Sequence, residues 1–263
     1  MSGRGLPQNT PRKRSVLKKP RLGSVHCIIP DVQARAGVDL SHLAWVGNYI
    51  ADKRPDVIVQ IGDFSDMLSL SKHKSNLDAE GVRYVEDIHA TKAAMETLVK
   101  PWKKLKSYRP RMVLTLGNHE ERIIREISEQ PILLGAISID DLGYKQAGWE
   151  VHKFLKVVKI DGWEYSHYFV SGAMGRPVTS AASLLRERQC SAVQGHVQYT
   201  DMAIHKKTGY IGIFAGICYL HDEDYLTPQG NSTRRQIVFL HQVANSQGDP
   251  MFVSLDFLKA RYS

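Results

Sequence analysis

Residues 57–66 read VIVQIGDFSD, in which an apolar, β-branched run passes directly into a glycine and two aspartates. The run predicts a buried strand over 57–61, because Val and Ile pack well on a pleated sheet and a strand covered on both faces needs no polar alternation. Gly62, Asp63 and Asp66 then fall at the carboxyl end of that strand. Ligands of open α/β sheets collect beyond this end, so these residues are the first candidates for a functional site.

Similar units lie on either side of this stretch. Short apolar runs alternate with segments of helical spacing, which predicts right-handed β-α-β crossovers and a largely parallel first sheet. Pro101 should kink or divide the longest helix, since proline lacks a backbone donor and crowds the preceding turn. We expect strands at 24–30 and 112–116 and helices at 41–53, 79–106 and 120–129.

The second half of the chain has a different pattern. Asp161-Gly162 lies between strand-like runs at 154–160 and 163–170, which is a strong hairpin signal. A sandwich of two sheets with flanking helices accommodates both halves in one α/β domain over 23–263. The remaining elements expected are a helix at 179–188 and strands at 191–194, 200–206, 210–219, 235–243 and 251–256, with the last strands completing the second sheet.

The net charge of +8 belongs almost entirely to the N-terminal segment. Residues 1–21 hold seven basic and no acidic side chains, so the rest of the chain carries 28 basic and 27 acidic residues. The mixture of Gly, Pro and Ser with these charges, without apolar periodicity, predicts a disordered basic arm over 1–22. Such an arm either attracts a nucleic-acid backbone through counterion release or is a solvated tail, and both interpretations stand.

The composition argues against a membrane or secreted protein. No apolar run approaches the roughly 18 residues of a membrane span, and no apolar segment of the secretory type follows the basic N-terminus. Cys27, Cys190 and Cys218 are odd in number and lack CxxC spacing. We therefore expect reduced thiols in a cytoplasmic protein, or one in the host cytoplasm if the source is viral.

Residue types that bind metals recur where the expected strands end. Carboxylate, amide and imidazole groups follow the first three strands, and further histidines stand in the hairpin and after a later strand. Because parallel strands end at one edge of a sheet, the first three sets should converge on one crevice. Neighbouring glycines let the backbone turn sharply enough for the side chains to reach a shared centre. In order, the segments are Asp31-x-Gln33, Gly62-Asp63-x-x-Asp66, Gly117-Asn118-His119-Glu120, His167 and Gly195-His196-x-Gln198.

Each segment alone is more typical of a turn or of a surface histidine. The ordered series, however, resembles the motifs of the calcineurin-like metallophosphoesterase family, whose pattern is D-x-H, G-D-x-x-D, G-N-H-[D/E], H and G-H-x-H. The match covers residues 24 to about 200. The resemblance implies a four-layer α-β-β-α sandwich, two divalent metal ions, and hydrolysis of phosphomonoesters or phosphodiesters.

The resemblance also implies a set of metal ligands. Two cations about 3.5–4 Å apart can hold a hydroxide and a phosphoryl oxygen for in-line attack, and one carboxylate can offer an oxygen to each cation. The implied ligands are Asn118, His167 and His196 at one ion, Asp31, Gln33 and Gln198 at the other, and Asp63 between the two.

Three further residues have roles by the same resemblance. His119 would be the histidine outside the ligand set that protonates the leaving group, a task suited to imidazole near neutral pH. Asp66 and Glu120 would hold neighbouring groups in orientation.

The sequence departs from the family pattern at Gln33 and Gln198, where the family has histidines of the same metal site. Amide oxygens are harder ligands than imidazole, which favours Mn²⁺ or Mg²⁺ over Zn²⁺. We expect Mn²⁺, with Mg²⁺, Zn²⁺ or Fe as alternatives. Three interpretations follow: the second ion binds loosely, it arrives with substrate, or catalysis at this site is impaired. Tyr168 is another departure, because the family often has glycine there.

Three arginines follow the motifs closely enough to reach a bound phosphate. Arg35, Arg122 and Arg176 could each clamp a phosphate in a bidentate manner. An exposed arginine in a surface salt bridge is at least as good an interpretation of each one.

The leading hypothesis is a metal-dependent phosphodiesterase with a nucleotide or nucleic-acid substrate, a choice that rests on the basic arm. The alternatives are a phosphomonoesterase acting on proteins or small molecules, and a binding scaffold that keeps the fold without turnover. Gln33 and Gln198 favour the scaffold, whereas an intact Gly-Asn-His-Glu segment with His119 favours catalysis.

Overall fold

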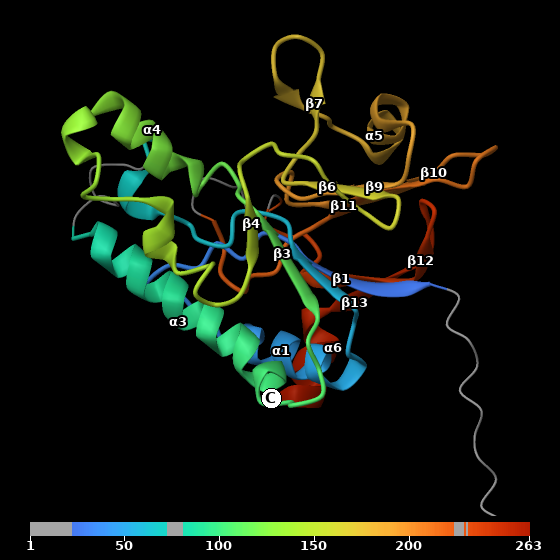
Figure 1. The fold of residues 1–263 in the computed structure, drawn as a ribbon, viewed down its shortest axis with the longest axis horizontal. Coiled ribbons are helices and arrows are strands. Elements are labelled where there is room, and N and C mark those ends of the chain that lie inside the picture. Colours follow the sequence, from blue (N-terminus) through green and yellow to red (C-terminus); the bar gives the residue numbers. More distant parts are fainter. Residues whose placement is uncertain (1–22, 73–80, 224–228, 230) are drawn as a thin grey trace, which may run out of the picture.

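The computed structural model describes residues 23–72, 81–223, 229 and 231–263, and the arm expected over 1–22 lies outside them. The described residues form a mixed α/β fold in which helices flank two large β-sheets (Figure 1). Within these residues, no helix is both long and apolar enough to cross a membrane.

A six-stranded sheet in the order β13-β12-β1-β2-β3-β4 carries the first half of the site. β1, β2 and β3 are parallel to one another, as expected, and β4 runs parallel to β3, whereas β12 is antiparallel to β1 and β13 is antiparallel to β12. The strands are β1 (Ser24–Ile29), β2 (Val57–Gln60), β3 (Arg111–Thr115), β4 (Glu150–His152), β12 (Gln236–Ala244) and β13 (Gln247–Ser254).

A second, five-stranded sheet has the order β10-β11-β9-β6-β5. Its β5–β6 hairpin turns at Asp161-Gly162, which confirms that prediction. The strands are β5 (Val158–Ile160), β6 (Trp163–Ser166), β9 (Ala192–Gln194), β10 (Thr200–Ile204) and β11 (Ile211–Ala215), and a separate two-stranded hairpin consists of β7 (Val170–Ser171) and β8 (Arg176–Pro177).

Helices cover the sheets on opposite sides (Figure 1). Three of them, α1, α3 and α6, pack beside the six-stranded sheet, and α5 packs on β9, β10 and β11. The α-helices are α1 (His42–Lys53), α3 (Tyr84–Lys103), α4 (Glu121–Glu129), α5 (Ala181–Arg188) and α6 (Leu255–Tyr262), with 3₁₀ turns η1 (Leu68–Leu70), η2 (Pro131–Leu133) and η3 (Ile139–Leu142).

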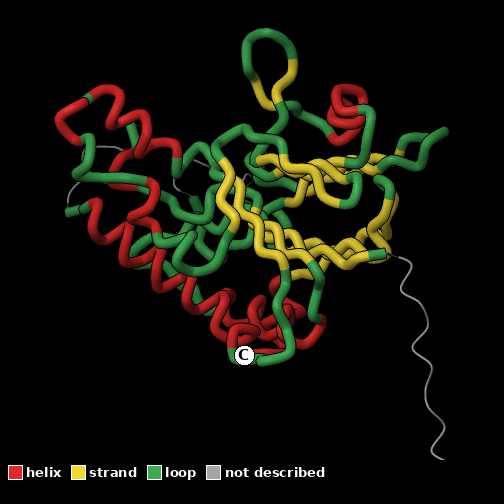
Figure 2. Tube along the Cα trace, in the orientation of Figure 1, coloured by secondary structure: helices red, strands yellow, loops and turns green. Residues whose placement is uncertain are grey.

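The core is divided by the six-stranded sheet, because alternate side chains of a strand point to opposite faces. On β1, Cys27 and Ile29 belong to the apolar cluster under the helices. Ile28 belongs to a second cluster that includes Tyr165 of β6 and Val193 of β9. The two large sheets are therefore joined through an apolar interior, visible as two groups of strands in Figure 2.

Two expectations about these elements are wrong, and one element was not expected. The C-terminal strands belong to the first sheet and do not complete the second one: β12 pairs with β1, and β13 pairs with β12. The segment after Ser254 is the helix α6, whose first turn is capped by the Ser254 side chain accepting from the Phe257 amide. The short strand β4 was not anticipated, because its three residues show little pattern.

Pro101 neither divides α3 nor ends it, since the helix continues to Lys103. The proline lies in the last turn, where only a short helical segment follows it. Gly47 of α1 faces this turn, and a Cβ atom there would lie 2.4 Å from the carbonyl oxygen of Leu98 and 2.9 Å from Cγ of Pro101. A glycine at position 47 therefore allows α1 and α3 to approach closely.

A buried histidine at the start of α1 makes the stability of the fold sensitive to acid. Burial lowers the pKa of His42 to about 4, although the Cys218 carbonyl and Asp39 act in the opposite direction. The unfolded chain then binds more protons than the folded chain below pH 6.5, so stability falls as the pH falls towards 4.

We expect His42→Gln to reduce the loss of unfolding free energy between pH 7 and pH 5 by about 2 kcal/mol. Urea unfolding with a chelator present measures this difference at both pH values. The matched control, His89→Gln, removes an exposed histidine of α3 and should behave as the wild type. An equal pH effect in wild type and His42→Gln would contradict the prediction.

Candidate metal centre

The structure brings the five motif segments together at one edge of the sheets. The backbone amides of Val32 and Gln33 donate to the carbonyl oxygen of Asp63, which joins the ends of β1 and β2. The His196 amide donates to Oδ1 of Asp31 at 3.2 Å, which joins the five-stranded sheet to the six-stranded one.

Three potential ligand atoms converge around the ring of His167. Its Nε2 atom lies 2.9 Å from Oδ1 of Asn118 and 3.2 Å from Oδ2 of Asp63. Asp63, His167 and His196 each offer one ligand atom within 4.8 Å of the others. The Nδ1 atom of His167 donates to the carbonyl oxygen of Ile61 at 3.0 Å, which aims Nε2 at the centre of the group.

The electrostatics of this group favour a positive charge at its centre. Burial lowers the pKa of His167, but the carboxylates of Asp63, Asp31 and Glu120 together raise it to about 9. Burial raises the pKa of Asp63, and the charges of His119 and His167 bring it below its usual value. A proton on Nε2 thus lies beside Oδ1 of Asn118 and Oδ2 of Asp63, and a divalent cation can take that place after the proton leaves.

Beside this group lies a second set of buried polar atoms without protein partners. Oδ2 of Asp31 and both amide atoms of Gln33 have no hydrogen-bond partner among the described residues. Burial raises the pKa of Asp31, and the neighbouring Asp63 carboxylate also raises it. Oε1 of Gln198 accepts from the Tyr219 hydroxyl at 3.4 Å. Buried polar atoms normally find partners, so the unpaired oxygens of Asp31 and Gln33 fit an ion with oxygen ligands.

Glu120 ties the second motif to the third. Its fully buried carboxylate accepts from the amides of Asp63, Ser65 and Gly117 at 2.8–3.1 Å. The Tyr144 hydroxyl donates to the same carboxylate at 3.0 Å. The backbone at the ends of β2 and β3 is therefore held by one side chain.

His119 lies against Asp66 at the rim of the metal-ligand group. Its Nδ1 atom is 2.9 Å from both the carbonyl oxygen and Oδ1 of Asp66, and its Nε2 atom is 3.7 Å from Oδ2 of Asp63. Burial lowers the pKa of His119, but the carboxylates of Asp63 and Asp66 raise it above its ordinary value. The ring is thus held through Nδ1, and Nε2 faces the candidate metal centre.

The motif glycines are required mainly because neighbouring side chains pack directly against their Cα atoms and leave no room for a Cβ atom. A Cβ atom at Gly117 would lie 2.0 Å from Oδ1 of Asp63, and one at Gly195 would lie 2.5 Å from Oδ1 of Asp31. Only Gly62 also has a positive φ, +99°, and its Cβ would lie 2.5 Å from Nδ1 of His167. The sharp turns expected at all three positions are therefore only part of the reason for glycine.

Two of the three expected phosphate clamps are engaged by protein groups. Arg35 donates through Nη1 to Oδ2 of Asp66 at 2.8 Å and also pairs with Glu223. Arg122 donates to the carbonyl oxygens of Asp66 and Met67. Arg176 is exposed on the β7–β8 hairpin. Phosphate binding by these arginines stays a prediction.

Two buried polar residues beside the motifs have no signal in the sequence. Glu223 is 3% exposed and pairs with Arg35, yet it lies in a loop far along the chain from every motif. Tyr144 is also buried and reaches Glu120 from a loop after η3. Only the three-dimensional arrangement reveals them.

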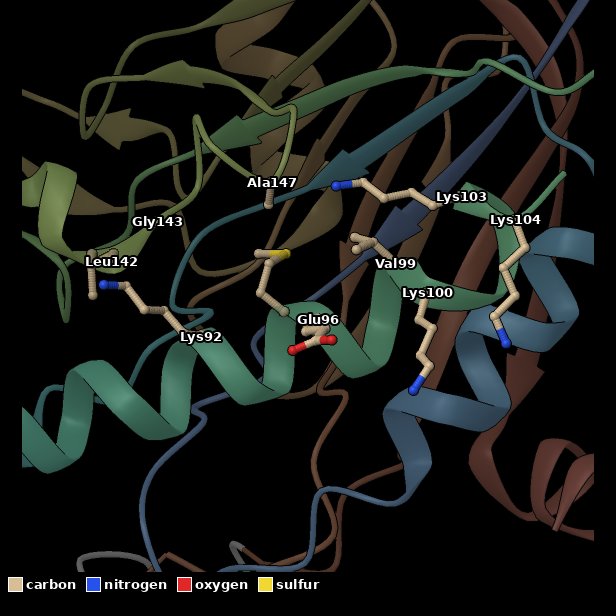
Figure 3. A pocket seen from close by; sticks show the side chains of 10 residues that line it. Lys92, Glu96, Val99, Lys100, Lys103, Lys104, Leu142, Gly143 and Ala147 are labelled. Atoms are coloured by element: carbon tan, nitrogen blue, oxygen red, sulfur yellow. The ribbon is translucent and has the colours of Figure 1, made fainter. Parts of the chain in front are cut away.

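A pocket of about 440 Å³ along α3 is separate from this centre (Figure 3). Four lysines surround it with Glu96 among them, and none of the motif residues lines it. The lysines are Lys92, Lys100, Lys103 and Lys104.

Comparison with known proteins adds no relative. No protein-family model matches the chain, and a search of curated proteins finds no match.

We expect metal-stripped wild-type protein to gain thermal stability on addition of Mn²⁺, because an ion that binds only the folded state stabilises it by about 2.7 kcal/mol at 100 times its Kd. His196→Ala should lose most of this gain. His152→Ala is the matched control, since His152 pairs with Glu150 outside the ligand group. Melting curves of each protein with and without Mn²⁺ measure the gain. An equal rise in melting temperature in wild type and His196→Ala would show that the ion binds elsewhere.

Proposed function

We propose that the chain is a divalent-metal-dependent phosphodiesterase of the calcineurin-like metallophosphoesterase type, built as a four-layer α-β-β-α sandwich. The observation that carries the proposal is the convergence of three ligand atoms: Oδ1 of Asn118 and Oδ2 of Asp63 lie 2.9 Å and 3.2 Å from Nε2 of His167. These groups come from three separate motifs and point at one place. A structural polar cluster has no need of two histidines, an amide and a carboxylate with this shared focus.

Two ions fit the residues present. Asn118, His167 and His196 would hold one, Asp31, Gln33 and Gln198 the other, and Asp63 both. The unpaired oxygens of Asp31 and Gln33 support the second site, and its oxygen-rich character favours Mn²⁺. When bound, two such ions supply a nucleophile at neutral pH and neutralise charge on the phosphoryl oxygens.

His119 would act on the leaving group. Its Nδ1 atom is held by Asp66, so Nε2 is free to donate a proton to the departing oxygen. Burial raises the pKa of Asp66, but His119 and Arg35 lower it to about 2, so Asp66 carries a negative charge near neutral pH. This charge stabilises the protonated ring of His119. The departing group then leaves as a neutral alcohol and not as an alkoxide.

The substrate that fits best is a phosphodiester of a nucleotide or nucleic acid. Arg35 and Arg122 both donate to protein acceptors, which leaves little positive charge near the centre to bind phosphate. A singly charged diester needs less such charge than a dianionic monoester does. The basic segment over 1–21 is a further argument for a polyanion.

We expect metal-stripped protein to hydrolyse bis(4-nitrophenyl) phosphate only after Mn²⁺ is added, with saturation. Asp63→Ala should abolish turnover, and His119→Ala should reduce it about 10²-fold or more while the Mn²⁺ dependence stays as in wild type. Release of 4-nitrophenol measures all three proteins.

Each failure has its own meaning. Parallel loss of turnover and Mn²⁺ affinity in His119→Ala would make His119 a ligand. Wild-type turnover no higher than that of Asp63→Ala would contradict catalysis on such diesters and favour the scaffold.

Deletion of residues 1–21 tests the nucleic-acid substrate separately. Hydrolysis of the small diester should not change, whereas binding of a polynucleotide should weaken and its dependence on log salt should flatten by roughly 0.9 per lost phosphate contact. Fluorescence anisotropy of a labelled oligonucleotide at several salt concentrations gives the slope. An unchanged slope would show that the arm is a solvated tail.

A further inference from the structure

Glu223 belongs to a chain of ion pairs that leads to His119. Nη1 of Arg35 lies 2.9 Å from Oε2 of Glu223 and 2.8 Å from Oδ2 of Asp66. The other oxygen of Asp66, Oδ1, lies 2.9 Å from Nδ1 of His119. The two carboxylate side chains are only 4% exposed and Arg35 only 13%, so water competes little for these contacts.

The loop that carries Glu223 holds the carboxylate in place. The Glu223 amide donates to Oδ1 of Asn231 at 2.9 Å, and Nδ2 of Asn231 donates back to the Glu223 carbonyl oxygen at 3.1 Å. Nε2 of His221 lies 2.8 Å from Oε1 of Glu223. The His221 ring stacks on Tyr219, with 4.6 Å between the ring centroids. Backbone, imidazole and aromatic contacts thus fix Glu223, which is the end of the ion-pair chain farthest from His119.

We propose that Glu223 is a positioning residue, which acts through Arg35 and Asp66 to hold the His119 ring in the orientation that protonates the leaving group. This inference rests on the proposed function. None of the motif segments contains Glu223, and it is not part of the ligand group.

The physical reason is that Asp66 must do two things with one carboxylate. Oδ1 orients the imidazole, and Oδ2 must be held so that the carboxylate does not rotate away from it. Arg35 fixes Oδ2, but a guanidinium on a flexible stem is itself held in one place only if a second acceptor restrains it. Glu223 is that acceptor, and it also balances the arginine charge in a site where burial makes an unpaired charge costly.

The test uses Glu223→Gln, which keeps the shape of the side chain and removes its charge. Substrates are methyl aryl phosphates whose leaving groups range from 4-nitrophenol to phenol. A poor leaving group depends most on protonation, so we expect kcat for the phenyl ester to fall about tenfold or more, with little change for the 4-nitrophenyl ester and an unchanged KM. Glu164→Gln, which breaks the Glu164–Arg188 pair between β6 and α5, is the matched control and should change kcat for neither ester.

A second comparison places the effect at His119. In the His119→Ala background, Glu223→Gln should lower the rate no further, because residues that act through one another are not additive. An equal fall for all leaving groups, or a further fall in that background, would overturn the proposal and assign Glu223 a general structural role.

A readout without turnover separates this inference from the proposed function. The imidazole Nδ1–H resonance of His119 can be assigned by its loss in His119→Ala and followed by NMR in the Mg²⁺-loaded full chain. We expect Glu223→Gln to shift or broaden it and Glu164→Gln to leave it in place. An unchanged resonance in Glu223→Gln would overturn the positioning role, whether or not the wild-type protein hydrolyses the esters. Absence of hydrolysis by the wild-type protein would by itself contradict only the proposed function.

Discussion

The arrangement of the candidate centre depends on the buried carboxylate of Glu120. A charge removed from water is stable only when hydrogen bonds replace its hydration. Four donors do so here: the amides of Asp63, Ser65 and Gly117 and the hydroxyl of Tyr144. Because two of these amides follow β2 and one follows β3, a single side chain sets the distance between the two strand ends. The Asp63 carboxylate can therefore meet groups from the third motif without any direct strand pairing at that level.

Backbone strain is concentrated at the same place. Gln33, Asp63, His196 and Gln198 are not glycines, yet their φ angles lie between +46° and +67°. Such conformations cost on the order of 1 kcal/mol or more each and persist where surrounding contacts fix them. At these four positions the strained backbone carries side chains that would bind metal. Local strain and candidate function coincide here, although turns elsewhere in the chain also contain positive φ angles.

The sequence predicted the elements that have strong local patterns. β2, the β5–β6 turn and α1 were placed within a residue or two, because buried β-branched runs, Asp-Gly turns and helical spacing are local signals. Sheet membership of β12 and β13 could not be predicted, since pairing between distant strands leaves no local trace. The motif residues were found because they follow strand ends. Glu223 was not, because its partners are distant in sequence and a single loop glutamate has no pattern.

The candidate ligands come from both sheets. Asp63 and Asn118 follow strands of the six-stranded sheet, whereas His167 and His196 follow strands of the five-stranded one. An ion held by all four would be a cross-link between the two halves of the chain, comparable to a disulfide but reversible by chelation or acid. Part of its binding free energy would then be folding free energy, because the two sheets must already be packed for the ligands to meet. Metal supply would thereby set how firmly the two sheets are held together, as well as the readiness of the centre.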